Sequence, residues 1–379
     1  MKIGWWAEVS ITPDTFVFGT PNNHLPLIKE AIRRDHDVRL IHIPWKADGK
    51  YVIETGARCL RMQEDLDAAI KRRKAIEDIV KTNSGLDATM RTFDAARTYC
   101  SRHEPDELPY DVVFMKLPPP GFLRTKLEVV YNMWRFCKAG VPVFCFDGDL
   151  MWDQAVEWFE AQPWEQNFVH ARTAYVPKKA LPQHKWWPYF YDPVGELPVQ
   201  AHRKIFDLGY VGNDWKQEGS PRAEGLGKFY GRSADAVWGR WTESNQDLTM
   251  IPKPMFFGPI PANQVHSKYA QCRASVILGL PGYYKTGLVT QRYREVLQAG
   301  CLGLPDAAYG DFSAPFFMPQ YRVKDYDDVR FWLELAHRDF GAYVEHVQQQ
   351  RDWVKNNHLL RLERWIDELE TLAGRQVKT

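Results

Sequence analysis

The sequence lacks the features that mark several special classes of protein. Its 49 Lys and Arg residues almost balance its 48 Asp and Glu residues, so net charge does not predict nucleic-acid binding, and any such surface must be a local patch. None of the 6 cysteines belongs to a CxxC pair, and we expect reduced, buried thiols in a cytoplasmic protein. No apolar run reaches the roughly 18 residues of a membrane span. The start, MKIGWWAEVS, does not resemble a secretory signal.

The composition is that of an ordinary globular protein, and the chain is long. The 379 residues are 45% hydrophobic and 26% charged, which excludes disorder and fibrous repeats. This length exceeds one ordinary core and fits two domains of about 150–200 residues each.

Strands alternate with helices in both halves of the sequence. This rhythm predicts parallel βαβ units, and therefore an α/β protein with two similar domains on either side of a cleft. A Pro- and Gly-containing segment at 191–199 is the expected linker. We expect strands at residues 1–7, 37–44, 111–117, 141–146, 205–211, 236–238, 274–280 and 301–304, and helices at 25–34, 126–139, 220–229 and 291–299.

The segment with the clearest chemistry lies in the second half. A buried strand there ends in a loop that carries Lys285, and a helix begins near Thr290. The free N–H groups and positive dipole end of a helix N-terminus suit a diphosphate, to which Arg292 adds a bidentate partner. Glu295, one turn further on the same face, can accept hydrogen bonds from two ribose hydroxyls. The pattern predicts a nucleoside-diphosphate site, and an exposed Arg–Glu ion pair is the alternative.

The same half carries longer motifs. One is F-x-G-x-I-P-x-N-x-V-x-x-K, from Phe256 to Lys268, followed by T-x-R-x-x-E from Thr290. Another is YVGN at 210–213, then a loop that reaches Arg222. These motifs resemble the carboxyl-terminal domain of GT-B glycosyltransferases, most closely that of the DNA β-glucosyltransferases of T-even phages. The resemblance implies a UDP-sugar donor held by Gly212, Asn213, Arg222, Lys268, Lys285, Thr290, Arg292 and Glu295, with Lys216 as the alternative to Arg222 on the phosphates.

The resemblance also implies an architecture. GT-B enzymes have two Rossmann-like domains that face each other across a cleft, and their C-terminal helix returns to the N-terminal domain. We therefore expect an acceptor-binding domain at residues 1–195 with a helical insertion at about 57–104. A nucleotide-sugar domain would follow at 196–345, and a final helix at 346–379 would pack on the first domain. We expect a monomer.

The amino-terminal half resembles the family more loosely. The strand at 141–146 ends in the triplet DGD, similar to the family strand whose terminal aspartate is the general base. Asp147, or else Asp149, would therefore deprotonate the acceptor in an inverting transfer. A carboxylate that the family places in the first loop falls on Asn23 or His24 here. The DGD triplet also suits a divalent cation, Mg or Mn, and a plain strand-end cap is the third reading.

The resemblance further implies an acceptor in phage DNA. The T-even enzymes transfer a sugar to the hydroxymethyl group of 5-hydroxymethylcytosine in duplex DNA, in the cytoplasm of the infected bacterial host. Such an acceptor requires a basic rim and a cleft for an extruded base, on which the aromatic segment KWWPYFY would stack; core packing is the alternative. A small-molecule or cell-surface glycan acceptor, a non-catalytic relative and an epimerase remain open, and the basic residues would then be ordinary solvated surface. The expected acceptor residues are Arg58, Arg61, Lys71, Arg72, Arg73, Lys74, Arg91, Arg97, Arg124, Lys126, Trp186 and Trp187.

Overall fold

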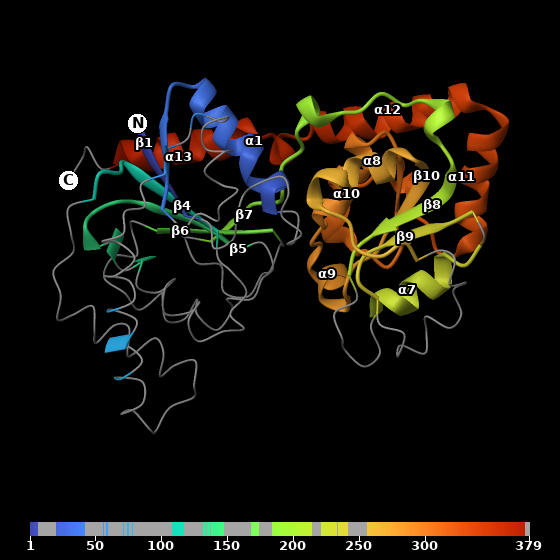
Figure 1. The fold of residues 1–379 in the computed structure, drawn as a ribbon, viewed down its shortest axis with the longest axis horizontal. Helices are drawn as coiled ribbons and strands as arrows, with labels where there is room; N and C mark the ends of the chain where they lie inside the picture. Colours follow the sequence, from blue (N-terminus) through green and yellow to red (C-terminus); the bar gives the residue numbers. More distant parts are fainter. Residues whose placement is uncertain are drawn as a thin grey trace.

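The protein contains two parallel β-sheets, which lie in separate lobes (Figure 1). Helices near the C-terminus cover the same side of both lobes in this view (Figure 1). The computed structural model describes residues 1–6, 20–41, 56, 58–59, 71, 74–75, 78, 108–116, 132–133, 135–136, 138–147, 168–173, 184–213, 221–232, 234–241 and 256–375.

The first sheet has the strand order β3-β2-β1-β4-β5-β6-β7, with every pair parallel. Its central strands are near-continuous apolar runs, as strands covered on both faces require. The chain runs outward from β1 to one edge and then returns to β4 on the other side of β1, so a crevice opens at the carboxyl ends of β1 and β4. The strands are β1 (Lys2–Trp6), β2 (Asp37–Leu40), β3 (Arg58–Cys59), β4 (Val112–Lys116), β5 (Val143–Asp147), β6 (Phe168–Arg172) and β7 (His184–Trp186), and helix α1 spans Thr20–Arg33.

The second sheet is smaller and has the order β11-β10-β8-β9, again all parallel. Its first strand, β8, lies between β9 and β10, so the order reverses between β8 and β10 and a second crevice opens at their carboxyl ends. The strands are β8 (Phe206–Val211), β9 (Ala236–Trp238), β10 (Cys272–Ile277) and β11 (Leu302–Pro305). The helices are α7 (Pro221–Phe229), α8 (Val265–Ala270), α9 (Pro281–Thr286), α10 (Gln291–Gln298), α11 (Tyr326–Arg338) and α12 (Phe340–Asn356).

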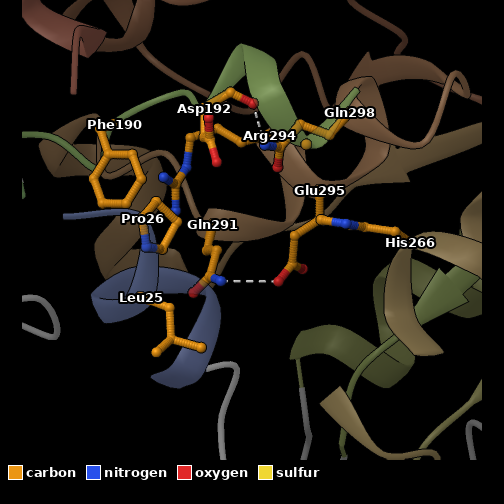
Figure 2. A pocket seen from close by; sticks show the side chains of 10 residues that line it. Leu25, Pro26, Phe190, Asp192, His266, Gln291, Arg294, Glu295 and Gln298 are labelled. Atoms are coloured by element: carbon orange, nitrogen blue, oxygen red, sulfur yellow. Dashed lines mark hydrogen bonds between the residues drawn. The ribbon is translucent and has the colours of Figure 1, made fainter. Parts of the chain in front are cut away.

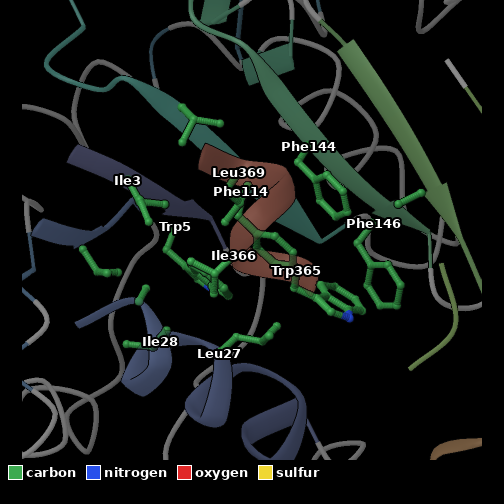
Figure 3. Close-up of a cluster of buried hydrophobic side chains, with 14 of the residues drawn as sticks. Ile3, Trp5, Leu27, Ile28, Phe114, Phe144, Phe146, Trp365, Ile366 and Leu369 are labelled. Carbon is green, nitrogen blue, oxygen red and sulfur yellow. The ribbon is translucent and has the colours of Figure 1, made fainter. Parts of the chain in front are cut away.

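The last helix, α13 (Glu363–Arg375), returns to the first domain. Its apolar face joins the core of the first sheet, where the Trp365 ring lies 4.7 Å from the ring of Phe146 (Figure 3). Arg34, directly after α1, pairs with Asp367 of α13 at 2.6 Å. The expected return of the final helix is confirmed. Within the expected segment 346–379, however, residues up to Asn356 belong to α12, which packs in the cores of the second domain.

Two chain segments connect the lobes, and they are bonded to each other. The Tyr191 N–H donates to the Leu360 carbonyl at 2.7 Å, and the outgoing and returning segments pair there in a parallel β-bridge. The buried Arg351 guanidinium then donates to the carbonyls of Leu197 and Leu297, at 2.8 Å each. The connection is therefore fixed to α10 and α12 of the second domain.

Most of the predicted elements are confirmed, with small shifts at their ends. Helix α1 begins at Thr20 rather than at residue 25. Strands β6 and β7 lie where no strand is predicted, because FVHAR and HKW are short and half polar. The expected helical insertion starts with an edge strand, since Cys59 pairs with Leu40 of β2; its described residues Lys71, Lys74, Ala75 and Asp78 are helical. No helix in the described part of the chain combines the length and hydrophobicity needed to cross a membrane.

Candidate functional site

The crevice of the second sheet begins with a tight turn after β8. The Gly212 N–H donates to the Trp238 carbonyl at 2.9 Å, and the Asn213 side chain accepts from the Arg240 N–H at 2.8 Å. Gly239 has φ +137°, and a Cβ there would overlap the carbonyl group of Gly212. The ends of β8 and β9 can therefore approach closely only because residue 239 is glycine.

Arg292, in the first turn of α10, lies directly on this turn. Its Nε donates to the Val211 carbonyl at 2.9 Å, and its guanidinium carbon lies 4.4 Å from the centre of the Tyr210 ring. A Cβ on Gly212 would be 2.7 Å from its Nη2. The Nη1 atom is buried and has no hydrogen-bond partner among the described residues. The sequence thus presents a buried cation with an unused donor at the carboxyl edge of the sheet.

Three hydroxyl groups around Arg292 share this property. The oxygens of Tyr210, Thr290 and Tyr309 are buried, and no described residue hydrogen-bonds to them. Burial raises the pKa of Tyr309 above its ordinary value, so its hydroxyl is a neutral donor. Tyr309 reaches the crevice because a Cβ on Gly279, just beyond β10, would lie only 3.0 Å from that hydroxyl.

A neighbouring tyrosine is fully engaged and forms a wall of the crevice. The Tyr284 hydroxyl donates to Asp306 at 3.0 Å and accepts from the Gly279 N–H at 3.0 Å. Its ring meets that of Tyr309 edge to face, with centroids 4.8 Å apart. Asp306 is also 3.7 Å from the Lys228 ammonium group. This network fixes the Tyr309 side of the crevice.

Unused buried donors are costly, at about 1–3 kcal/mol each. Four of them converge here, on Arg292, Tyr210, Thr290 and Tyr309, beside the N-terminus of α10. Helix N-termini and arginine both favour anions. The arrangement therefore fits a ligand that supplies several anionic oxygens, such as a diphosphate.

Glu295 faces a different space, a cavity of about 180 Å³ between the two domains (Figure 2). Its carboxylate accepts from the Gln291 amide at 2.9 Å, within α10. Burial raises the pKa of Asp192 and lowers that of Arg294 to about 10. Because Arg292 faces the crevice and Glu295 faces this cavity, α10 presents two adjacent faces that fit the two ends of a nucleoside diphosphate. The cavity is lined by Leu25, Pro26, Phe190, Asp192, Gly195, His266, Gln291, Arg294, Glu295 and Gln298.

The remaining predicted donor residues are less fully defined. The Lys268 ammonium lies 5.9 Å from the centre of the Trp238 ring, at the end of β9. Arg222 and Lys285 fall in α7 and α9, but their side chains lie outside the description. Lys216 lies outside the described residues.

In the first domain, Asp147 is the last residue of β5 and is 1% exposed. It lies at the carboxyl edge of its sheet, in register with Arg172 of β6. Asp149 lies outside the described residues. His24, one position for the family's first-loop carboxylate, is buried, and its Nδ1 accepts from the Trp5 indole at 2.9 Å. His24 thus supports the core; the side chain of Asn23 is not described.

The expected acceptor surface is only partly described. Lys71 and Lys74 are exposed, and Arg58 lies in β3. Arg61, Arg72, Arg73, Arg91, Arg97, Arg124 and Lys126 lie outside the described residues.

The structure contradicts a base-stacking role for Trp187. This residue is 3% exposed and packs edge to face on Phe144, at 5.3 Å, in the first-domain core. The Arg364 guanidinium covers its ring at 3.7 Å, so neither face can receive a base. Trp186 is half-buried against Phe316 of the second domain, at 5.2 Å. The two tryptophans of this segment thus fill a core and a domain contact, whereas Phe190 of the same segment lines the cavity between the domains.

Tyr210, Tyr309 and His266 are site residues that the motifs do not single out. Tyr210 has a detectable signal, because it stands two residues before Gly212 and so points to the same face of the strand. Tyr309 has none, because it follows β11 and reaches the crevice only through the sheet order. Among the described residues, no three His, Cys, Asp or Glu side chains gather as metal ligands.

Comparison with known proteins supports this architecture. Neither a scan against protein families nor a search of curated sequences finds a match. Among solved structures, the chain is similar to T4 phage BGT in complex with its UDP-glucose substrate, with 13% identity, a TM-score of 0.57 and coverage of 98% of this chain and 99% of that one. It is similar to Anabaena Alr3699/HepE in complex with UDP and glucose, with 10% identity, a TM-score of 0.57 and the same coverage. T4 phage BGT is also known in complex with UDP and Mn2+. Two parallel Rossmann-like sheets with a returning C-terminal helix, matched over nearly the whole chain, show that this protein has the GT-B fold.

Proposed function

We propose that this protein is a glycosyltransferase that uses a UDP-sugar as donor. The observation that carries the proposal is the set of four buried, unused donors around Arg292, at the switch point of the second sheet. Structures with the same fold bind UDP-glucose or UDP, and the donor set here fits the same kind of group. Ligands of open parallel sheets bind at such a switch point.

The diphosphate would lie between the Gly212 turn and the first turn of α10. Arg292 and the hydroxyls of Tyr210 and Tyr309 would donate to its oxygens, and the ribose would extend toward Glu295. Negative charge grows on the diphosphate as the bond to the sugar breaks. Donors that are already fixed and buried stabilise that charge without reorganising.

Asp147 would act as the general base. In an inverting transfer, the acceptor hydroxyl oxygen attacks the anomeric carbon and the bond from that carbon to the phosphate oxygen breaks. The hydroxyl proton passes to the Asp147 carboxylate, and UDP leaves with the bonding electrons. The position of Asp147 at the carboxyl edge of β5, on the crevice side of its sheet, supports this role, and Asp149 is the alternative base.

A divalent cation, Mg or Mn, could accompany the diphosphate, as the complex of T4 phage BGT with UDP and Mn2+ illustrates. The described side chains offer no ligand cluster for it.

We further propose that the acceptor is the hydroxymethyl group of 5-hydroxymethylcytosine in duplex phage DNA, modified by a monomer in the cytoplasm of the infected bacterium. The sequence resemblance to T-even DNA glucosyltransferases and the likeness to a DNA modifying enzyme support it. Lys71 and Lys74 are exposed on the first domain, where phosphate contacts would be needed.

The test is a transfer assay with radiolabelled UDP-sugars and duplex DNA that contains cytosine, 5-hydroxymethylcytosine or 5-hydroxymethyluracil. We expect label only in the 5-hydroxymethylcytosine DNA, with a yield that falls as salt rises. Donor consumption without DNA labelling would overturn the DNA acceptor and leave a small acceptor. A new UDP-sugar formed without any acceptor would indicate an epimerase, and no binding of UDP would overturn the donor assignment.

A further inference from the structure

His266, on the short helix α8, projects into the cavity between the domains (Figure 2). Its Nε2 atom is buried, and the ring makes no hydrogen bond with any residue that the structure describes. The neighbouring Val265 and Tyr269 are buried in the second-domain core, so they, and not His266, hold the helix in place. The imidazole is thus a polar group in a cavity with an unused nitrogen.

The charged groups that face the imidazole define its state. Burial lowers the pKa of His266. The nearby carboxylates of Glu295 and Asp192 raise it in part, and the Arg294 cation lowers it, so the pKa lies below its ordinary value. The ring is therefore neutral near pH 7, with one nitrogen that donates and one that accepts. Glu295, on the same cavity, is an acceptor when ionised.

We propose that His266 joins Glu295, the ribose partner in the proposed function, at the vicinal diol of the donor ribose, and that His266 selects ribonucleoside over 2′-deoxyribonucleoside diphosphates. This inference rests on the proposed function, because it requires that a nucleoside diphosphate occupies the site. A vicinal diol offers two O–H donors and two acceptor oxygens. The carboxylate accepts hydrogen bonds from the diol, and the imidazole exchanges one with the 2′ oxygen.

The position of α10 supports this pairing. Arg292, at the phosphate crevice, and Glu295, at the cavity, are one turn apart on the helix, and they interact electrostatically. A diphosphate on Arg292 therefore directs its attached ribose toward the cavity that His266 lines. A 2′-deoxyribose would leave the buried His266 nitrogen unpaired. Sites that hydrogen-bond a ligand hydroxyl reject the analogue without it, here by about 10- to 100-fold in affinity.

The test compares the binding of UDP and 2′-deoxy-UDP by titration calorimetry. We expect the wild type to bind UDP about 10- to 100-fold more tightly than 2′-deoxy-UDP. His266→Ala should reduce this ratio to within about 3-fold, mainly by weakening UDP. His266→Gln, which keeps a donor and an acceptor, should restore part of it and replaces the alanine variant if that variant does not fold.

Two controls separate the possible failures. The matched control is His202→Ala, because His202 is an exposed histidine just after the linker and is not among the cavity-lining residues; its ratio should equal that of the wild type. Arg292→Ala should weaken both ligands and preserve the ratio. UDP binding with a ratio near one, or a ratio unchanged in His266→Ala, would overturn the inference alone. A folded wild type that binds neither ligand would overturn the proposed function as well.

Discussion

Gly212 packs closely against Arg292 in the donor crevice, so an alanine at this position tests the site. A Cβ at this position would lie 2.7 Å from Nη2 of Arg292 and 2.8 Å from a ring carbon of Tyr210. Both distances are too short for real contacts, so the two neighbours must shift, and the less firmly held one shifts further. Tyr210 is fully buried in the core, whereas Arg292 is held at this end by one hydrogen bond to Val211. The arginine is therefore displaced.

The expected cost follows from what Arg292 loses. A charge-assisted hydrogen bond contributes about 1.5–3 kcal/mol, so Gly212→Ala should weaken UDP binding by about 10- to 150-fold. Overpacking should lower the free energy of unfolding by about 1–3 kcal/mol. Gly227 in α7 is the matched control, because a Cβ there meets nothing within 4 Å. Gly227→Ala should leave UDP affinity unchanged and raise the free energy of unfolding by about 0.5–1 kcal/mol.

A double-mutant cycle identifies the route of the effect. If Gly212→Ala acts through the guanidinium, then Gly212→Ala with Arg292→Ala should bind UDP as weakly as Arg292→Ala alone, because coupled changes are not additive. Calorimetry with UDP measures all four proteins, and urea unfolding confirms that each is folded. Additive losses in the cycle, or wild-type affinity in Gly212→Ala, would refute the placement of the diphosphate beside Arg292.

Three further predictions concern catalysis and stability. Asp147→Asn should lower kcat by about 100-fold or more and leave the affinity for UDP unchanged, and a fully active variant would move the base to Asp149. Trp365→Ala should lower the free energy of unfolding by about 3–5 kcal/mol, because this ring sits in the first-domain core; a loss below about 1 kcal/mol in urea unfolding would contradict that packing. Burial raises the pKa of Asp235 to about 6, so the contribution of Asp235 to stability should fall as pH rises from about 4 to 6, by up to about 3 kcal/mol. Asp235→Asn lacks this titration and should gain stability relative to the wild type over that range; parallel pH profiles from urea unfolding would contradict the raised pKa.

The strands of both sheets could be predicted because buried parallel strands must be apolar. DVVFMKL and VPVFCF show this pattern; β4 lies within the first, and β5 begins within the second and ends one residue beyond it, at Asp147. β7 escaped prediction because HKW has no apolar run, and only its pairing with β6 makes it a strand. At Trp187 the apolar signal is clear but its meaning is not, because an aromatic segment that lines a cleft has the same sequence pattern as one that fills a core. Its burial depends on α13, which comes from a distant part of the sequence.

Some residues of the donor site could also be predicted from the sequence, and others could not. Thr290 and Arg292 could be predicted because they lie together at one helix N-terminus, and the structure places both at the crevice with unused buried donors. Their spacing predicts one shared helix face for Arg292 and Glu295, yet Arg292 points to the β8 turn while Glu295 lines the cavity between the domains. The spacing of two residues on a helix determines the angle between their side chains around the helix axis, but it does not determine which neighbouring element each side chain contacts. Tyr309 could not be predicted at all, because the strand order alone brings it beside Gly279.

Helix α10 carries the donor site and is also tied to the connection between the lobes. Near its C-terminal end, the Gln298 amide donates to the carbonyl of Asp192, and the Gln298 carbonyl accepts from the N–H of Leu197 and from Arg351. The same helix therefore presents Arg292 to the phosphate crevice and holds the linker that leads to the first domain. Any shift of α10 that a bound diphosphate causes must move or strain these linker bonds, because they are buried and direct. This gives the donor site a physical connection to the position of the domain that would carry the acceptor.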